Sequence, residues 1–403
     1  MDVFIPKEQK PHIILQIQEA GDIMIYLDNA ATTYPKPKSV YKNVMDAMTK
    51  YGANPGRGSH AMAIEGARVI YETRELLAEL FNLDDPMRVI LTFNATDGLN
   101  MAIKGILKPG DHVITTAMEH NSVLRPIKEL ENIGVENTIV SCSQEGKINV
   151  EDIEAAIKTN TRMVVTTHVS NLTGTIFPIE KIGEMCKRRN VLYLVDGSQS
   201  AGVLEIDMQK QHIDFLAVPG HKGLLGPQGT GALLINNSDA EIKELKEGGT
   251  GSESSNPHQP NFYPDKLEAG THNLPGIAGL NAGLKYILNK GTKSILSHEK
   301  NILETFINEV RKNPKIVIYG PENINDRSGV VPVNIAGMDS SEVAYILDTE
   351  YNIAVRPGLH CAPLAHKTIC TENIGAVRFG IGPFTIRTDV IAAAKALNEI
   401  SER

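Results

Sequence analysis

The sequence predicts an α/β protein in which helices cover both faces of a mostly parallel sheet. Three observations lead to this prediction. Short apolar runs alternate with amphipathic helical segments through the first two thirds of the chain, which is the pattern of βαβ units. The length of 403 residues is enough for two domains and a large core. The pattern changes near residue 293, so we expect a leader over residues 1–25, a large domain over residues 26–292 and a smaller α+β domain over residues 293–403.

The expected elements of the large domain follow from hydrophobic periodicity. The segment YLDNAATT, residues 26–33, predicts a short strand that runs into a loop of small side chains. Two helices are expected to end near residues 51 and 81, separated by a glycine-rich loop that contains Arg57 and His60. Strands are then expected over residues 87–93, 112–117, 136–143, 162–170, 191–196 and 214–218, with helices over residues 96–107, 121–133, 150–158 and 179–189.

A polar segment rich in Gly, Ser, Pro and Asn, residues 247–273, follows the large sheet. Because it is too long for an ordinary connection, we expect either disorder or a functional loop. Helices are expected next over residues 275–288 and 294–312. The smaller domain is then expected to contain strands over residues 315–319, 330–336, 353–357 and 376–381, a helix over residues 341–350 and a final helix.

Composition and charge narrow the class of protein. A formal net charge of -8 without a basic block argues against a general nucleic-acid-binding protein. No apolar run approaches the roughly 20 residues that a membrane helix needs, and the first residues lack the apolar core of a signal peptide. Four cysteines are too few for a disulfide framework in a chain of this length. We therefore expect a cytoplasmic protein without a nucleic-acid or membrane partner.

Two residues near neighbouring strand ends indicate a bound cofactor. Asp196 ends the strand VLYLVD, and Lys222 lies in the glycine-rich loop PGHKGLLGPQGTG after the next strand. A lysine in this place suits a Schiff base with pyridoxal 5′-phosphate (PLP), and a carboxylate suits the pyridinium nitrogen. From these two residues alone, a solvated lysine and a strand-end acid are the alternative. Ligands of parallel sheets bind beyond the carboxyl ends of the strands. At those ends we expect Thr96, Glu119, His120, Asn171 and Asp196.

Three further residues carry groups that such a ligand needs. Thr96 is expected at a helix start, where its hydroxyl and the helix N–H groups suit a phosphate, and a plain N-cap is the alternative. His120 can stack on an aromatic ring, and a loop histidine without a function is the alternative. Arg378 can hold a carboxylate through two parallel hydrogen bonds, and a surface ion pair is the alternative.

The segment AVRPGLHCAPLAHKTIC, residues 354–370, contains the most suggestive thiol. Cys361 follows His360 and is close in sequence to Arg356, on a loop with Pro and Gly. Positive neighbours favour the reactive thiolate and a loop exposes it, while an inert cysteine is the alternative. The spacing of Cys361 and Cys370 does not match the usual close pairs of a zinc site, so we expect no metal.

Taken together, these motifs resemble the cysteine desulfurase and selenocysteine lyase family, fold-type I PLP enzymes of the class V aminotransferase group. The resemblance runs from YLDNAATT to the last helix. Its most specific part is VDGSQSAG followed by GHKGLLGPQGTG, supported by HVSNLTGT (residues 168–175), EAGTHN (residues 268–273) and RPGLHCAP (residues 356–363). The short segment around Cys361 is similar to the SUF-type branch, which implies a compact and ordered cysteine loop.

The resemblance implies PLP as the cofactor and a role for each matching residue. It makes Lys222 the Schiff-base lysine, Asp196 the partner of the pyridinium nitrogen and Gln199 the partner of the phenolic oxygen. His120 is implied to stack on the ring and to help move protons. The implied phosphate contacts are Thr96, His221 and, from the other subunit of a homodimer, Thr271.

The implied reaction converts L-cysteine to L-alanine, with selenocysteine as a second candidate substrate. Ala31, Asn171 and Arg378 are the implied substrate-binding residues. Lys222 takes the proton from Cα, and Cys361 attacks the substrate sulfur and keeps it as a persulfide. A sulfur-acceptor protein is the implied partner, and iron–sulfur cluster assembly, thio-cofactor synthesis and tRNA modification all stay open as the pathway.

The sequence departs from the family pattern in three places. Pro219 replaces a frequent hydroxyl residue three positions before the lysine, and Ala95 replaces a frequent threonine before Thr96. These two changes remove possible phosphate donors. The run Phe384-Thr385-Ile386 replaces a common Tyr/Phe-Asn-Thr run after Arg378, which leaves the role of that loop open.

Two other functions stay open at this point. One is another class V activity, such as that of an aminotransferase or an epimerase, which needs Lys222 and Asp196 but no persulfide cysteine. The other is a PLP-bound scaffold that passes sulfur to a partner or regulates it without turnover. The presence of lysine, aspartate, histidine and cysteine in one chain favours the desulfurase over the scaffold.

Overall fold

A seven-stranded sheet in the order β2-β8-β7-β6-β5-β3-β4 forms the centre of the protein. The computed structural model describes residues 24–403 except 56–57 and 238, so most of the expected leader, and Arg57, lie outside the described residues. The β3–β4, β3–β5, β5–β6 and β6–β7 pairs are parallel, and β8 is antiparallel to both of its neighbours. The prediction of an α/β fold with a mostly parallel sheet is confirmed. The strands are β2 (Val89–Thr92), β3 (His112–Thr116), β4 (Glu136–Val140), β5 (Thr161–Thr167), β6 (Leu192–Asp196), β7 (Phe215–Pro219) and β8 (Gly231–Ile235).

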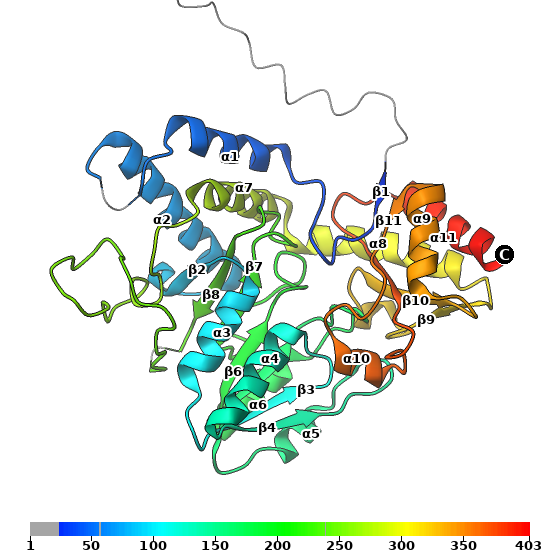
Figure 1. Ribbon diagram of the computed structural model, residues 1–403, viewed down its shortest axis with the longest axis horizontal. Coiled ribbons are helices and arrows are strands. Elements are labelled where there is room, and N and C mark those ends of the chain that lie inside the picture. The colour runs from blue at the N-terminus through cyan, green and yellow to red at the C-terminus, as the bar shows by residue number, and fades with distance from the viewer. Residues whose placement is uncertain (1–23, 56–57, 238) are drawn as a thin grey trace, which may run out of the picture.

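Helices form a layer on each face of this sheet (Figure 1). Because side chains alternate along a strand, neighbours on β7 enter different cores. Phe215 and Ala217 belong to the core that contains α3 and α4, whereas Leu216 and Val218 belong to the core that contains α2, α6 and α7. The strand is therefore apolar on both faces. These helices are α2 (Ala61–Phe81), α3 (Ala95–Ile106), α4 (Asn121–Leu130), α6 (Ile179–Arg189) and α7 (Leu274–Lys290).

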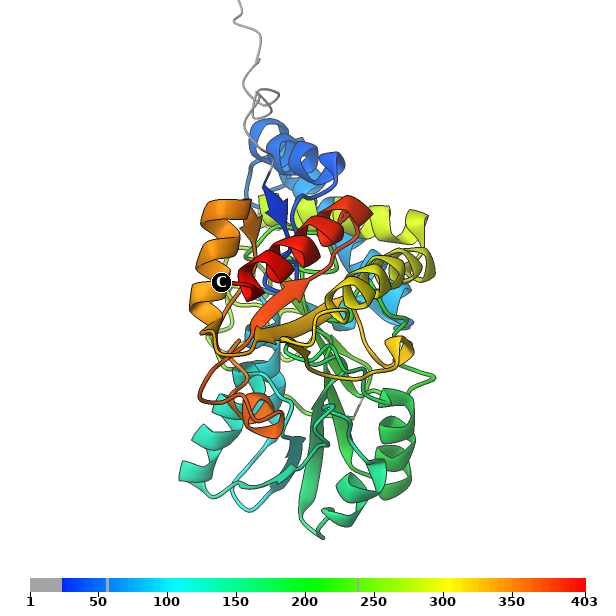
Figure 2. The ribbon, with the colours of Figure 1, turned by 90° about the vertical axis from the view of Figure 1, so that its right-hand side faces the viewer.

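The C-terminal elements enclose a separate core around two small sheets (Figure 2). An antiparallel sheet has the order β12-β10-β9, and β1 pairs in parallel with β11. Leu27, directly after β1, belongs to this same core. The division of the chain at residues 26 and 293 stays a prediction. The elements are β1 (Ile25–Tyr26), α8 (Thr292–Val310), β9 (Ile316–Ile318), β10 (Val330–Ile335), α9 (Ser340–Tyr351), β11 (Ile353–Ala354), β12 (Val377–Gly380) and α11 (Arg387–Ser401).

Three further helices complete the described elements, apart from short 3-10 turns. Helix α1 (Lys38–Lys50) packs along α7, and α5 (Val150–Ala155) connects β4 with β5. Helix α10 (Pro363–Thr368) follows Cys361 directly after Ala362. The 3-10 turns are Pro86–Arg88, Glu131–Ile133 and Ile324–Asp326.

The structure differs from the sequence expectation in a few elements. Strand β8 and helix α10 lie outside the predicted set, because β8 follows directly on the glycine-rich loop and α10 begins at Pro363 within the cysteine loop, so that turn signals hid both. The alternative that Thr96 is a plain N-cap is wrong: Asn94 is the N-cap of α3, and its side chain accepts a hydrogen bond of 2.9 Å from the N–H of Asp97. The segment 247–273 contains turns and bends without a helix or strand.

Candidate active site

A cavity of about 230 Å³ lies at the carboxyl ends of the parallel strands. This is the edge at which ligands bind in such sheets. Cys361 and Thr271 are not part of its lining. The cavity brings together nine of the eleven predicted site residues, namely Ala31, Thr96, His120, Asn171, Asp196, Gln199, His221, Lys222 and Arg378. A larger open hollow of about 540 Å³ lies at the opposite edge of the sheet and contains none of them.

Lys222 lines the cavity from the loop that follows β7. Burial, and next the charge of Arg378, lower the pKa of Lys222 to about 8. A lowered pKa increases the neutral fraction of the amine, which is the form that attacks an aldehyde carbon. The loop is fixed at the carbonyl oxygen of His221, which accepts hydrogen bonds from Thr32 Oγ1 at 3.1 Å and from Lys36 Nζ at 2.5 Å.

Asp196 is the last residue of β6 and is only 2 % exposed. Its Oδ1 atom accepts a hydrogen bond of 2.9 Å from the backbone N–H of Ser198. The negative charge of Asp196 acts on two neighbours, because it raises the pKa of both His120 and Lys222 against the larger effect of their burial. A buried carboxylate at a cavity wall suits a cationic group of a ligand, since burial without a partner is costly.

His120 is the N-cap of α4, with its Nδ1 atom 3.0 Å from the donating N–H of Ser122. Because Nδ1 accepts this bond, the proton of the neutral ring lies on Nε2. Burial is the main cause that lowers the pKa of His120 to about 4, so the ring is neutral near pH 7. The Ser122 hydroxyl is 2.8 Å from His120 Nδ1 and 2.7 Å from Thr96 Oγ1. Ser122 therefore links the two residues.

Arg378 lies on β12 and is 1 % exposed. Its Nη1 atom donates to the carbonyl oxygen of Asn171 at 3.0 Å, and its Nη2 atom forms an ion pair of 3.0 Å with Asp28 Oδ1. Burial lowers the pKa of Arg378, and Asp28 opposes this effect. The alternative of a surface ion pair is wrong because the guanidinium is buried. The pair ties β12 to the small-residue loop after β1.

Three buried polar atoms of residues in the cavity wall have no hydrogen-bond partner among the described residues. They are Asn171 Oδ1, His221 Nδ1 and Arg378 Nε. Buried polar groups in folded proteins are nearly always paired, so these atoms indicate a polar ligand. Together with the amine of Lys222 and the carboxylate of Asp196, they fit a ligand that carries an aldehyde, a phosphate and a protonated ring nitrogen.

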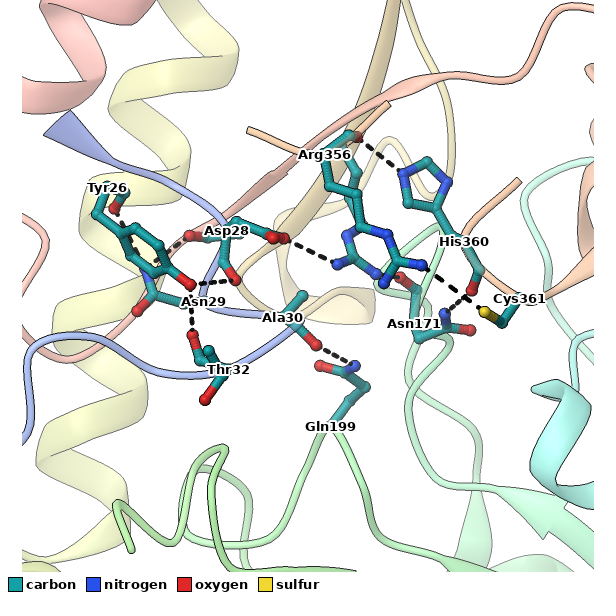
Figure 3. Close-up of polar contacts among 12 residues, drawn as sticks. Tyr26, Asp28, Asn29, Ala30, Thr32, Asn171, Gln199, Arg356, His360 and Cys361 are labelled. Carbon is teal, nitrogen blue, oxygen red and sulfur yellow. Dashed lines mark hydrogen bonds and ion pairs between the residues drawn. The ribbon is translucent and has the colours of Figure 1, made fainter. Parts of the chain in front are cut away.

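Cys361 lies on an exposed loop beside the cavity (Figure 3). Its Sγ atom is 3.7 Å from Nη2 of Arg356, a residue that lines the cavity. The carbonyl oxygen of Cys361 accepts a hydrogen bond of 2.8 Å from the backbone N–H of Asn121. Asn171 Nδ2 donates to the carbonyl oxygen of His360, also at 2.8 Å. The loop is thus attached on two sides, to the first residue of α4 and to Asn171 in the cavity wall.

The other cysteines offer poorer nucleophiles or lie elsewhere. Burial raises the pKa of Cys142 to about 12, and burial also raises the pKa of Cys186. Cys370 is exposed and follows α10. The thiol beside the cavity is therefore Cys361.

Thr271 is exposed, in a loop that the cavity does not include. The loop is fixed by Glu268, whose two carboxylate oxygens accept hydrogen bonds of 2.7 and 2.6 Å from Arg74. The same carboxylate accepts the N–H of Leu91 at 2.6 Å and lies 2.9 Å from His272 Nε2. A role for Thr271 in the site of a second copy stays a prediction.

Sequence reasoning did not assign a role to Arg356, Asp28 or Ser122. Arg356 was predicted only as a positive neighbour of the thiol, whereas its side chain also lines the cavity. Asp28 is the acid of YLDNAATT, and its position directly after a strand was the available signal. Ser122 lies two residues after His120 in MEHNS, where a hydroxyl near a helix start was the available signal.

Metal and membrane features are absent from the part of the chain that the structure describes. Residues 24–403, without 56–57 and 238, contain no group of three or more His, Cys, Asp or Glu side chains arranged to hold a metal ion. No helix within these residues is long and apolar enough to cross a membrane.

The class of protein follows from the order of the sheet and from the residues at its carboxyl edge, which are Lys222, Asp196, His120 and Arg378. The chain belongs to the class V aminotransferase family, because the family model described as "Aminotransferase class-V" matches residues 25–392. Within this class, similar proteins include several that are named as cysteine desulfurases or probable cysteine desulfurases. A protein named as a probable cysteine desulfurase from Methanothermobacter thermautotrophicus is 34% identical over 94% of this chain and 94% of its own length. Another, from Pyrococcus abyssi, is 35% identical over 84% of this chain and 85% of its own length.

A solved structure agrees with these relatives. The apo structure of the cysteine desulfurase from Thermococcus onnurineus matches this chain with a TM-score of 0.88 and 31% identity, over 94% of this chain and 95% of that chain. The cysteine desulfurase CsdA from Escherichia coli matches with a TM-score of 0.83 and 25% identity, over 94% of this chain and 95% of that chain. The predicted membership of the cysteine desulfurase family is confirmed, and the assignment to the SUF-type branch stays a prediction.

Proposed function

We propose that this protein is a PLP-dependent cysteine desulfurase that converts L-cysteine to L-alanine and keeps the sulfur as a persulfide on Cys361. One observation carries the proposal. Lys222 and Asp196 line one cavity, and Arg356 lines the same cavity with its Nη2 atom 3.7 Å from Cys361 Sγ. An aminotransferase or an epimerase needs the first two residues only. The exposed thiol beside the cavity therefore favours sulfur transfer.

The cavity wall offers a contact for each polar group of PLP. Bound PLP supplies an aldehyde for the amine of the substrate and a protonated ring that accepts electrons from Cα. Lys222 supplies the amine for the aldehyde, and Asp196 supplies the negative charge for the ring nitrogen. Gln199 Nε2 donates one N–H to the carbonyl oxygen of Ala30 at 2.9 Å, which leaves its second N–H for the phenolic oxygen. The phosphate contacts are the hydroxyl of Thr96 and the ring of His221.

The substrate carboxylate is assigned to Arg378 and Asn171. Nη1 and Nη2 of Arg378 each use one N–H in the hydrogen bonds described above, and Nε uses none. The guanidinium therefore has donors left for a carboxylate. Asp28 fixes its orientation, which spares the entropy of ordering it on binding. Ala31, also in the wall, leaves room for a small amino acid because its side chain is a single methyl group.

The side chains of Lys222, His120 and Cys361 have separate roles in the reaction. The neutral amine of Lys222 takes the proton from Cα of the substrate. The neutral ring of His120 keeps its Nε2 proton and adds no charge beside the ligand. The Cys361 thiolate attacks the substrate sulfur, so that an S–S bond forms while the Cβ–S bond breaks. Cysteine and one thiol give alanine and one persulfide, so this half of the cycle consumes no outside oxidant or reductant.

We also infer a homodimer and a protein that accepts the sulfur. Thr271 lies outside the cavity, so a phosphate contact from it requires a second copy. Helices α1 and α2 expose apolar side chains suited to such a contact, with Met48 63%, Ile64 58% and Tyr71 47% exposed. The exposed position of Cys361 leaves a persulfide there accessible to an acceptor. A cytoplasmic location and activity on selenocysteine stay predictions.

The test is a single-turnover reaction of the purified protein with L-cysteine in the absence of a reductant. We expect one alanine per site and one extra sulfur on Cys361. Trypsin cuts after Lys367, so Cys361 and Cys370 fall on separate peptides and mass spectrometry can tell them apart. Lys222→Ala is expected to lose both products and the visible absorption of bound PLP. Pyruvate formed from alanine and a keto acid, with no sulfur on Cys361, would instead establish an aminotransferase.

A further inference from the structure

The loop that contains Cys361 is connected to a series of hydrogen-bonded side chains, two of them buried histidines. The proposed chemistry assigns no role to these side chains. His360 precedes Cys361, and its ring stacks on that of His366, with the ring centroids 5.5 Å apart and the planes at 10°. His360 is 2 % exposed and His366 is fully buried. Two buried histidines beside an exposed thiol call for a physical explanation, because buried polar rings need partners.

Every ring nitrogen of His360 and His366 has a hydrogen-bond partner, and the partners determine which atom donates in each hydrogen bond. His360 Nε2 lies 2.9 Å from the carbonyl oxygen of Arg356, which can only accept, so His360 donates there. Burial lowers the pKa of His360 to about 3 and that of His366 to about 4, so both rings carry one proton each. His360 Nδ1 therefore accepts from His366 Nε2 at 3.2 Å. His366 Nδ1 in turn accepts from the hydroxyl of Thr371 at 2.7 Å.

This series of hydrogen bonds ends at the backbone carbonyl oxygen of Arg356, the residue whose side chain lies beside the thiol. The carbonyl oxygen of Arg356 accepts from His360 and also from the backbone N–H of Arg378 at 2.8 Å. Both of its lone pairs are thus used, and they join the cysteine loop to β12. The hydrogen bonds run from Thr371, after α10, to the strand that holds the predicted carboxylate-binding arginine.

This attachment acts on a strained piece of backbone. His360 and Cys361 have φ angles of 50° and 56°, two left-handed residues in a row without a glycine. Such conformations persist when the surroundings fix them, and they concentrate at functional sites. The carbonyl oxygens of His360 and Cys361 are held by Asn171 and Asn121, as described above. The ring of His360 is held by His366 alone on its Nδ1 side.

We propose that His366 is a positioning residue for the reactive thiol: through His360 it holds the left-handed turn that keeps Cys361 Sγ beside Arg356. The inference rests on the proposed function only in that Cys361 is taken as the sulfur acceptor. His366 is not among the residues that line the cavity, and its ring nitrogens bond to His360 and Thr371, so its effect on the reaction is indirect.

The test compares variants that remove or keep the hydrogen bonds of His366. His366→Leu removes both bonds, and His366→Gln keeps one donor and one acceptor in a side chain of similar size. Alkylation of Cys361 by iodoacetamide in the full-length PLP-loaded protein reports the thiol without any turnover, and Cys370 on its own tryptic peptide is the internal reference. We expect His366→Leu to slow both alkylation and persulfide formation about tenfold with unchanged PLP content, and His366→Gln to stay within about threefold of the parent.

A second pair of variants covers the case in which the His366 variants do not fold. Thr371→Val removes the hydroxyl that bonds to His366 Nδ1 with little change in side-chain shape, and Thr371→Ser keeps the hydroxyl. We expect about fivefold slower alkylation for Val and the parent rate for Ser, since one hydrogen bond is lost in the first only. The proposal is overturned if Cys361 in His366→Leu is alkylated at the rate of the parent protein. If His366→Leu does not fold, the same result in Thr371→Val overturns it. So does a His366→Gln variant that is as slow as His366→Leu. If the protein releases no alanine from cysteine, the proposed function fails, while the alkylation rates still decide the role of His366.

Discussion

The guanidinium of Arg356 connects the cavity with the reactive thiol, because its Nη2 atom lies 3.7 Å from Cys361 Sγ while the same side chain lines the cavity. The guanidinium can donate a hydrogen bond to the sulfur, and its positive charge attracts the carboxylate of an amino acid. The backbone of Arg356 also pairs with Arg378, through hydrogen bonds of 3.3 and 2.8 Å. One residue thus connects Cys361, the proposed sulfur acceptor, with Arg378, the residue that we propose holds the substrate carboxylate.

Arg356→Gln is expected to slow alkylation of Cys361 by about threefold to tenfold at neutral pH, because the sulfur loses the guanidinium that lies 3.7 Å from it. Persulfide formation should slow by at least as much. The matched control is Arg125→Gln, an exposed arginine of α4 that is outside the cavity lining. Equal alkylation rates in Arg356→Gln and the parent protein would show that the guanidinium does not act on the thiol.

Asp28→Asn removes the carboxylate that pairs with Arg378 at 3.0 Å. The guanidinium stays buried but loses its orientation, so we expect the KM for cysteine to rise about tenfold with a smaller change in kcat. The free energy of unfolding should fall by about 1–3 kcal/mol, because a charged hydrogen-bond partner of a buried group is lost. Steady-state kinetics and urea unfolding measure the two effects. Asp46→Asn, on a half-buried surface acid that pairs with the exposed Lys42 and Lys50, is the control and should change neither value. An unchanged KM in Asp28→Asn contradicts the assigned role.

Glu268→Gln breaks the buried network with Arg74 and is expected to cost about 3 kcal/mol of unfolding free energy. Burial alone opposes ionisation of Glu268, but the hydrogen bond from His272 and the charge of Arg74 outweigh it, so the pKa of Glu268 lies below its ordinary value of 4.5. A lowered folded-state pKa means that the stabilisation is complete above the ordinary pKa and is lost as the pH falls through the folded-state value.

The pH dependence of this effect separates a charge from a packing contact. Urea unfolding of the parent protein and of Glu268→Gln should therefore differ by a constant amount above about pH 4.5 and converge below it. Glu154→Gln, which removes a half-buried surface partner of the exposed Arg188 and Arg189, is the control. A gap that does not shrink in acid indicates that the ionised state of Glu268 is not what stabilises the fold.

Cys361→Ser is expected to lose most cysteine desulfuration and to keep PLP and substantial activity on selenocysteine. Sulfur on the β-carbon is a poor leaving group unless a nucleophile accepts it, whereas selenium leaves more readily. Alanine release from each substrate, measured side by side with and without a reductant, checks this expectation. Full desulfurase activity in Cys361→Ser would remove Cys361 from its proposed role, and Cys142→Ser is the control because burial raises the pKa of that thiol to about 12.

Much of the fold could be predicted because its signals are local. The apolar run of β7 and the alternation of strands with helices depend on residues within one element, so hydrophobic period was sufficient to predict them. The same kind of local signal placed the candidate site residues at one edge of the sheet, since Asp196 directly ends a strand and Lys222 follows the next one. Strand β8 was missed because it follows directly on the glycine-rich loop, whose turn signals extend to its first residue, Gly231.

The sequence by itself determined the sheet class, the family and the residue types of the site, since motifs and periods are properties of neighbouring residues. Only the tertiary structure decided which of these residues meet. Asp28 and Arg378 are 350 positions apart and form one ion pair, and Asn171 reaches the carbonyl oxygen of His360 across 189 positions. Such contacts depend on how the C-terminal core packs against the large sheet. No local pattern encodes that packing, because burial and geometry between distant segments arise only when the whole chain has folded.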